Sequence, residues 1–121
     1  MAANENPEIV DKFLQVLPFT VPQDHGVVSE ETIFAWAPLV TTAQGHLFER
    51  LRDAPIGRIH FSQATGQKVI IHYGGVTEDL AILVLGEVLP EYKDQLVEVG
   101  HRVLQSTFET KEDIMLTIEL V

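Results

Sequence analysis

Three short apolar segments separated only by turns constrain the fold more than any other feature of the chain. They are GRIHFSQA at residues 57–64, QKVIIHYGG at 67–75 and DLAILVLGEV at 79–88. Strands connected this closely are expected to be antiparallel neighbours, because a parallel crossover takes a dozen or more residues. The third segment is apolar on both faces, which is typical of a central strand covered on both sides. The sequence therefore predicts an antiparallel meander.

Helical spacing of apolar residues surrounds this meander. The spacing predicts helices over residues 7–17, 29–53 and 90–110. Ser29 can cap the second of these helices, and Pro38 lies inside it, where a proline removes a hydrogen bond and produces a kink. The second helix carries large apolar residues on more than one side, so we expect it to pack against more than one surface.

The two ends of the chain carry weaker patterns. The alternating segment DIMLTIELV at residues 113–121 predicts an extra strand, and the proline-flanked PFTVP at 18–22 predicts an edge strand or a loop. Residues 1–7 have no periodicity, and we expect them to be disordered. Together these patterns predict a single α+β domain over residues 1–121, an antiparallel sheet with helices on its faces.

The turn at residues 64–67 sets the predicted register of the first two strands of the meander. If Gln63 lies opposite Lys68 across this turn, cross-strand partners alternate outward from that pair. This register places His60 and His72 on opposite faces of the sheet, so the two rings could not share a ligand.

Composition excludes several classes of function. Eight Lys and Arg residues against 18 Asp and Glu residues give a formal charge of −10, which disfavours binding to nucleic-acid phosphates. The chain has no cysteine, so thiolate chemistry and disulfides are excluded. The longest apolar run, residues 80–85, is far shorter than a membrane span. We expect a cytoplasmic protein that does not insert into membranes.

No local motif indicates catalysis, a cofactor or a metal. Gly74-Gly75 lacks the lysine and hydroxyl residues of a phosphate loop. A metal site needs at least three ligands, and no spacing supplies a third. We therefore predict no catalytic, cofactor-binding or metal-binding residues, and a protein that is not an enzyme. The polar pairs that come nearest to a site are Asp24 with His25, His46 with Glu49, and His60 with His72.

The order of elements over residues 29–108 resembles the Roadblock/light-chain-seven family of dynein light chains, Ragulator subunits and bacterial GTPase regulators. The resemblance follows the acidic start SEET of an apolar helix, the hairpin IGRIHFSQATGQKVIIHYGG, the strand DLAILVLGEV and a closing helix. The family also has a hairpin before its long helix. Only PFTVPQDHGVV at residues 18–28 is available here, so we expect an atypical front end in a Roadblock/profilin-like fold.

The resemblance implies a non-catalytic module that forms a homodimer or pairs with another Roadblock-family protein, and that binds a small Ras-like GTPase. Within the family, the bacterial branch that controls cell polarity and gliding motility is the nearest in character. The strand at residues 58–63 would pair with its twin across a two-fold axis, and the long helices would pack together. The dimer interface implied in this way comprises Ile33, Trp36, Val40, Leu47, Arg58, Ile59, His60 and Phe61.

Two alternatives from other classes remain open at this point. One is a small-molecule sensor domain of profilin-like α+β fold, with a pocket near Trp36, His72 and Tyr73. The other is a hydrolase whose histidine and carboxylate groups converge in space rather than in sequence.

Overall fold

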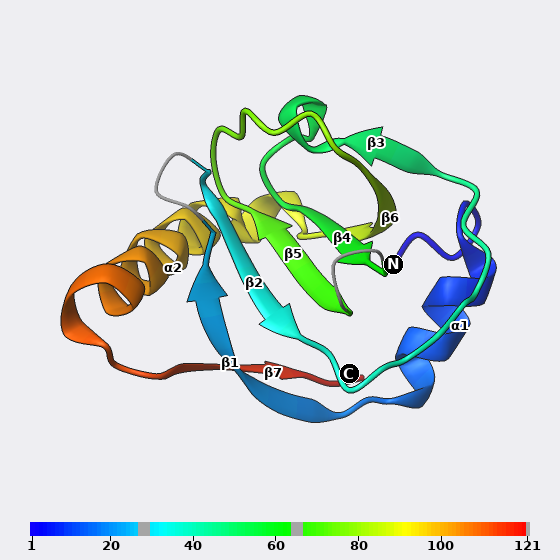
Figure 1. Ribbon diagram of the computed structural model, residues 1–121, viewed down its shortest axis with the longest axis horizontal. Coiled ribbons are helices and arrows are strands. Elements are labelled where there is room, and N and C mark those ends of the chain that lie inside the picture. The colour runs from blue at the N-terminus through cyan, green and yellow to red at the C-terminus, as the bar shows by residue number, and fades with distance from the viewer. Residues whose placement is uncertain (27–29, 64–66, 121) are drawn as a thin grey trace.

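Within the residues that the structure describes, 1–26, 30–63 and 67–120, seven strands form one antiparallel sheet (Figure 1). The computed structural model gives the strand order β3-β6-β4-β5-β2-β1-β7. The strands are β1 (Phe19–His25), β2 (Thr32–Trp36), β3 (Phe48–Arg50), β4 (Arg58–Ser62), β5 (Lys68–His72), β6 (Ala81–Glu87) and β7 (Ile114–Ile118). The helices are α1 (Pro7–Gln15) and α2 (Lys93–Gln105), with short helical turns η1 (Leu51–Asp53), η2 (Pro90–Tyr92) and η3 (Ser106–Thr110).

Both helices cover the same face of the sheet. Ile9 and Phe13 of α1 pack against Phe61 of β4, while Val103 of α2 packs against Tyr73, directly after β5. These residues share a face because side chains alternate along each strand. The helices predicted over residues 7–17 and 90–110 are thereby confirmed. None of the described helices is long and apolar enough to cross a membrane.

The helix predicted over residues 29–53 is wrong. The segment contains β2 and β3, with an irregular connection between them that includes Pro38. In β2, Ile33 and Ala35 are each 1% exposed, and this two-residue alternation is that of a strand. β-branched and aromatic residues favour that state, and Pro38 prevents a helix from continuing. Ser29, the expected helix cap, lies outside the described residues.

The strands of the meander are antiparallel as predicted, but their order differs. β6 pairs with β4, so β4 lies between β5 and β6 and the three strands are not in sequence order. β6 is central only in that it has a strand neighbour on each side, β3 on one and β4 on the other. Its residues 82–86 are buried.

The register between β4 and β5 is shifted by one residue from the prediction. Ser62, not Gln63, lies opposite Lys68, and His60 lies opposite Ile70. A one-residue slip moves every side chain to the other face of the sheet. His60 and His72 therefore share a face, against the prediction that they point apart. Residues 64–66 of the expected turn lie outside the described residues.

Both ends of the chain contact the sheet. The predicted C-terminal strand is confirmed as β7, an edge strand that pairs with β1 (Figure 1). At the front, where the sequence predicts disorder over residues 1–7, the structure shows contacts with β6. The backbone N–H of Ala2 donates to the carbonyl of Leu85, at 2.8 Å, and the Asn6 side chain is fully buried.

The residues assigned to a dimer interface are scattered. Within the assigned set, Ile33, His60 and Phe61 are at most 1% exposed, whereas Val40 is 86% exposed. The edge expected to pair with a twin belongs to β4, whose two sides are taken by β5 and β6. Trp36 is at the end of β2, and Leu47 lies just before β3 rather than on a helix. Self-association itself stays a prediction, which light scattering can test.

Candidate functional site

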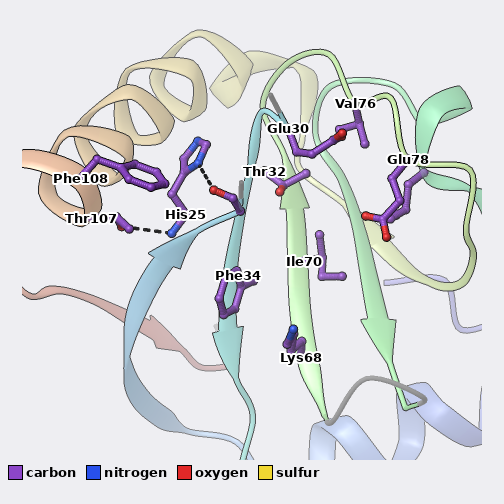
Figure 2. A pocket seen from close by; sticks show the side chains of 12 residues that line it. His25, Glu30, Thr32, Phe34, Lys68, Ile70, Val76, Glu78, Thr107 and Phe108 are labelled. Carbon is purple, nitrogen blue, oxygen red and sulfur yellow. Dashed lines mark hydrogen bonds between the residues drawn. The ribbon is translucent and has the colours of Figure 1, made fainter. Parts of the chain in front are cut away.

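A cavity of about 450 Å³ opens on the face of the sheet opposite the two helices. Its size is within the ~300–1,000 Å³ that small-molecule sites occupy. Residues from β2 and β5, the end of β1, the connection after β5 and the turn after α2 surround it (Figure 2). The lining consists of His25, Gly26, Glu30, Thr32, Phe34, Leu51, Lys68, Ile70, Val76, Glu78, Thr107 and Phe108.

Apolar side chains form the middle of the cavity. Phe34 on β2 and Ile70 on β5 are direct cross-strand partners and lie side by side in Figure 2. Val76, from the connection after β5, and Phe108, from the turn after α2, come from opposite sides of the cavity. A planar apolar group can therefore lie over the Phe34–Ile70 pair with contacts on several sides.

Glu30 places a negative charge at one end of the cavity. It is only 8% exposed, and its carboxylate accepts hydrogen bonds from both the backbone N–H, at 2.8 Å, and the hydroxyl of Thr77. Burial alone would raise the pKa of Glu30, but these hydrogen bonds outweigh it and hold the pKa below its ordinary value. Glu30 is thus a buried anion, and the exposed carboxylate of Glu78 lies at the same cavity.

Lys68 places a positive charge at the other end. In Figure 2 its side chain lies beyond Phe34 and Ile70, on the far side of them from Glu30. Its ammonium group lies 4.9 Å from the centre of the Phe34 ring and 5.1 Å from that of Trp36. These distances are typical of cation–π contacts. The cavity is therefore an apolar trough with unlike charges at its two ends.

His25 is held firmly at the side of the cavity. Its backbone N–H donates to the Thr107 hydroxyl at 3.2 Å, and its Nδ1 lies 2.8 Å from the carbonyl of Gly26 (Figure 2). A carbonyl only accepts, so Nδ1 carries the proton and Nε2 accepts from the hydroxyl of Tyr73. Burial, assisted by the charge of Glu31, raises the pKa of Tyr73 to about 12, which keeps that hydroxyl protonated.

A second polar group lies on the same face of the sheet, beside the cavity. His60 contacts the carboxylate of Glu49 through Nε2 at 2.8 Å and His72 through Nδ1 at 3.0 Å. Arg58 donates to the same Glu49 oxygen at 2.7 Å. Both histidines are fully buried. Burial, with the nearby Arg58 charge and, for His72, the neighbouring ring, lowers the pKa of each to about 4.

The three polar pairs considered from the sequence have different fates. Asp24 is exposed and does not line the cavity, although it lies opposite Phe34, whereas His25 lies opposite Ile33 and borders the cavity at the end of β1. His46 is also exposed, and the structure pairs Glu49 with His60 instead. Among the described residues, no three histidine or carboxylate side chains are grouped so that they could hold a metal ion.

The cavity does not lie where the sequence predicts a pocket, near Trp36, His72 and Tyr73. None of these three residues lines the cavity, although Trp36 contacts Lys68 and Tyr73 supports His25. Sequence reasoning misses the charged residues Glu30 and Lys68. The helical interpretation of residues 29–53 makes Glu30 part of a helix start, and the one-residue register error conceals the face to which Lys68 belongs.

Comparison with known proteins overturns the predicted family. No protein-family model matches the chain, and no curated protein does. The fold is similar to a solved structure of McbB in complex with tryptophan, with a TM-score of 0.89 and 26% sequence identity. The match covers 98% of this chain and 39% of that one, so the chain spans well under half the length of McbB.

The Roadblock resemblance is therefore wrong, and with it the interpretation of the chain as a GTPase-binding module in cell polarity or motility. That resemblance depends on a long helix before the strands, where the structure has β2 and β3. The comparison places this chain with McbB in fold.

Proposed function

We propose that this chain is a small-molecule-binding domain and that its cavity binds an aromatic amine of the tryptophan class. The observation that carries the proposal is the likeness of almost the whole chain to McbB, whose structure was solved with tryptophan. What the remainder of McbB contributes to that complex is not transferred to this chain. The cavity offers chemistry of its own that supports the same ligand class.

Energetics indicate that the apolar wall alone would bind weakly. Burying an aromatic side chain removes ~150–250 Å² from water, which at ~25 cal/mol per Å² contributes roughly 4–6 kcal/mol. Association costs about 4 kcal/mol or more, whereas a micromolar Kd requires about 8 kcal/mol net. A useful affinity therefore requires a polar contact as well as contact with Phe34 and Ile70.

Glu30 is the group best placed to supply that contact. Thr77 satisfies only part of its carboxylate, which has about four acceptor positions. An ammonium group bound there would lie in a partly desolvated environment, where a charged hydrogen bond is stronger than at the surface. The ligand's ammonium group lies toward Glu30 and Glu78, and its ring lies over Phe34 and Ile70 toward Lys68.

Titration calorimetry with three ligands tests this arrangement. L-tryptophan and tryptamine carry both the ring and the ammonium group, whereas indole-3-propionate lacks the ammonium group. We expect the first two to bind with micromolar to low millimolar Kd and the third at least tenfold more weakly. Absence of binding by both amines, or equal binding of all three compounds, would contradict the proposal.

Charge-matched variants separate a local effect from a general one. Glu30→Gln removes the buried anion and should weaken tryptamine binding about tenfold or more. Glu98→Gln makes the same change on the exposed surface of α2 and should leave the affinity unchanged. Equal effects of the two substitutions would mean that overall charge, rather than the cavity, attracts the amine. Circular dichroism on both variants confirms that each remains folded.

A further inference from the structure

The hydrogen bonds around His60 and His72 assign the protons on both rings. Arg58 forms an ion pair with Glu49, so the Glu49 carboxylate accepts and His60 Nε2 donates to it. His60 Nδ1 then carries no proton and can accept a hydrogen bond, because the low pKa of the ring keeps the ring neutral at neutral pH. This nitrogen accepts from Nε2–H of His72. Because the neutral His72 ring carries its proton on Nε2, His72 Nδ1 is also unprotonated and is a hydrogen-bond acceptor.

This last nitrogen is unusual. In the part of the chain that the structure describes, His72 Nδ1 is the buried side-chain nitrogen or oxygen atom that lacks a hydrogen-bond partner. Leaving a buried acceptor unpaired costs ~1–3 kcal/mol. Such an atom in a folded protein therefore needs an explanation, and a bound ligand is one.

The position of His72 connects it to the cavity. It lies opposite Thr32 in the β2–β5 register and two residues beyond Ile70 on the same face, and both of these residues line the cavity. The charge of Glu30, at the anionic end of the cavity, acts on the His72 ring and partly offsets the lowering of its pKa by burial. His72 thus neighbours two residues of the proposed binding site without itself lining the cavity.

We infer that the Glu49–His60–His72 chain fixes His72 Nδ1 as a hydrogen-bond acceptor that selects ligands carrying a second N–H donor, such as an indole. This inference rests on the proposed function, in which the ammonium group lies toward Glu30. The indole N–H pairs with His72 Nδ1, which is covered in the free protein and must become accessible when the ligand binds. Glu49 and His60 are positioning residues that hold the ring in its acceptor form. The site should therefore bind an indole more tightly than a ring of the same shape that lacks the N–H donor.

The ligand pair that tests this is L-tryptophan and 3-benzothienyl-L-alanine, in which sulfur replaces the indole N–H. Pairing or orphaning a buried acceptor is worth ~1–3 kcal/mol, which corresponds to roughly 5- to 150-fold in Kd. Calorimetry on the wild-type protein should show at least fivefold tighter binding of tryptophan. His72→Leu should bring the ratio of the two Kd values close to one. A purely structural role would weaken both ligands alike and leave the ratio unchanged.

Nitrogen-15 NMR of the imidazole rings gives a readout that does not depend on the variant folding. Both rings should be Nε2–H tautomers in the free protein, and the Nδ1 signal of His72 should shift when tryptophan is added. An Nδ1–H tautomer at His72, or tryptophan binding with no discrimination against the sulfur analogue, overturns the inference alone. Failure of tryptophan to bind at all overturns the proposed function and the inference together.

Discussion

Gly100 is the position where a single methyl group should do most damage to the framework behind the site. A Cβ placed on Gly100 would lie 2.3, 2.4 and 2.5 Å from Cγ, Cδ1 and Cδ2 of Tyr73. Ordinary contacts of a Cβ begin near 3.4 Å, so α2 or the ring must move by about 1 Å. The ring is 1% exposed and belongs to the chain just after β5, which leaves it little room to yield.

Two opposing effects determine the stability of Gly100→Ala. Overpacking in a core costs typically ~1–3 kcal/mol, and atoms this close favour the upper end of that range. Alanine in place of glycine inside a helix returns about 1 kcal/mol. We expect a net loss of about 2 kcal/mol in the free energy of unfolding, or a decrease in Tm of roughly 6–12 °C for a domain of this size.

Urea denaturation followed by circular dichroism measures this change. Gly75→Ala is the matched control, because its Cβ would meet only the Glu31 carboxylate oxygen at 3.7 Å; its stability should change by less than about 0.5 kcal/mol. A Gly100→Ala protein that is more stable than the wild type would refute the packing of α2 against Tyr73, because the gain in helix propensity would then exceed any cost of overpacking.

The free energy of unfolding should decrease as the pH falls from about 6.5 toward 4, by up to ~3 kcal/mol for each of the His60 and His72 rings. The reason is that both rings take up protons in the unfolded chain before they do in the folded one. Urea midpoints that do not change over this pH range would contradict the burial of the two rings as neutral groups. Asn6→Ala should cost ~3 kcal/mol or more in chemical denaturation, because four buried or partly buried hydrogen bonds of 2.6–3.0 Å are lost. Deleting residues 113–121 should lower the Tm by several degrees, and fast amide exchange of β7 in the intact protein would argue against its pairing with β1.

Local pattern predicts those elements whose environment is simple. The alternation in residues 113–121 indicates β7, since an edge strand needs only one strand partner. The helix over residues 7–17 is predicted correctly because one apolar stripe faces one sheet. In contrast, Ile33, Trp36 and Val40 happen to recur at helical spacing, and this coincidence outweighs Pro38 and the strand-forming residues of β2.

The candidate site could not be predicted in the same way. Its walls come from three regions that are far apart in sequence, represented by Glu30 with Phe34, by Ile70 and by Phe108. These regions meet only because β5 pairs with β2 and α2 ends beside β1. The contact between His60 and His72 is missed because the predicted register of β4 and β5 is wrong by one residue. The sequence does not give the length of the turn between these strands, and so it does not fix their register. Long-range pairing, and not composition, creates this site.

Intermolecular NOEs between L-tryptophan and the methyl groups of the protein test most directly whether this cavity is the binding site. We expect NOEs from the indole protons to the methyl groups of Ile70 and Val76, which lie in the cavity around Phe34. A second hollow, lined by Ala43, Ile82 and Leu83 among others, supplies an internal control. Indole NOEs to those methyl groups in place of Ile70 and Val76, or none to any methyl group at saturating tryptophan, would contradict binding in the cavity.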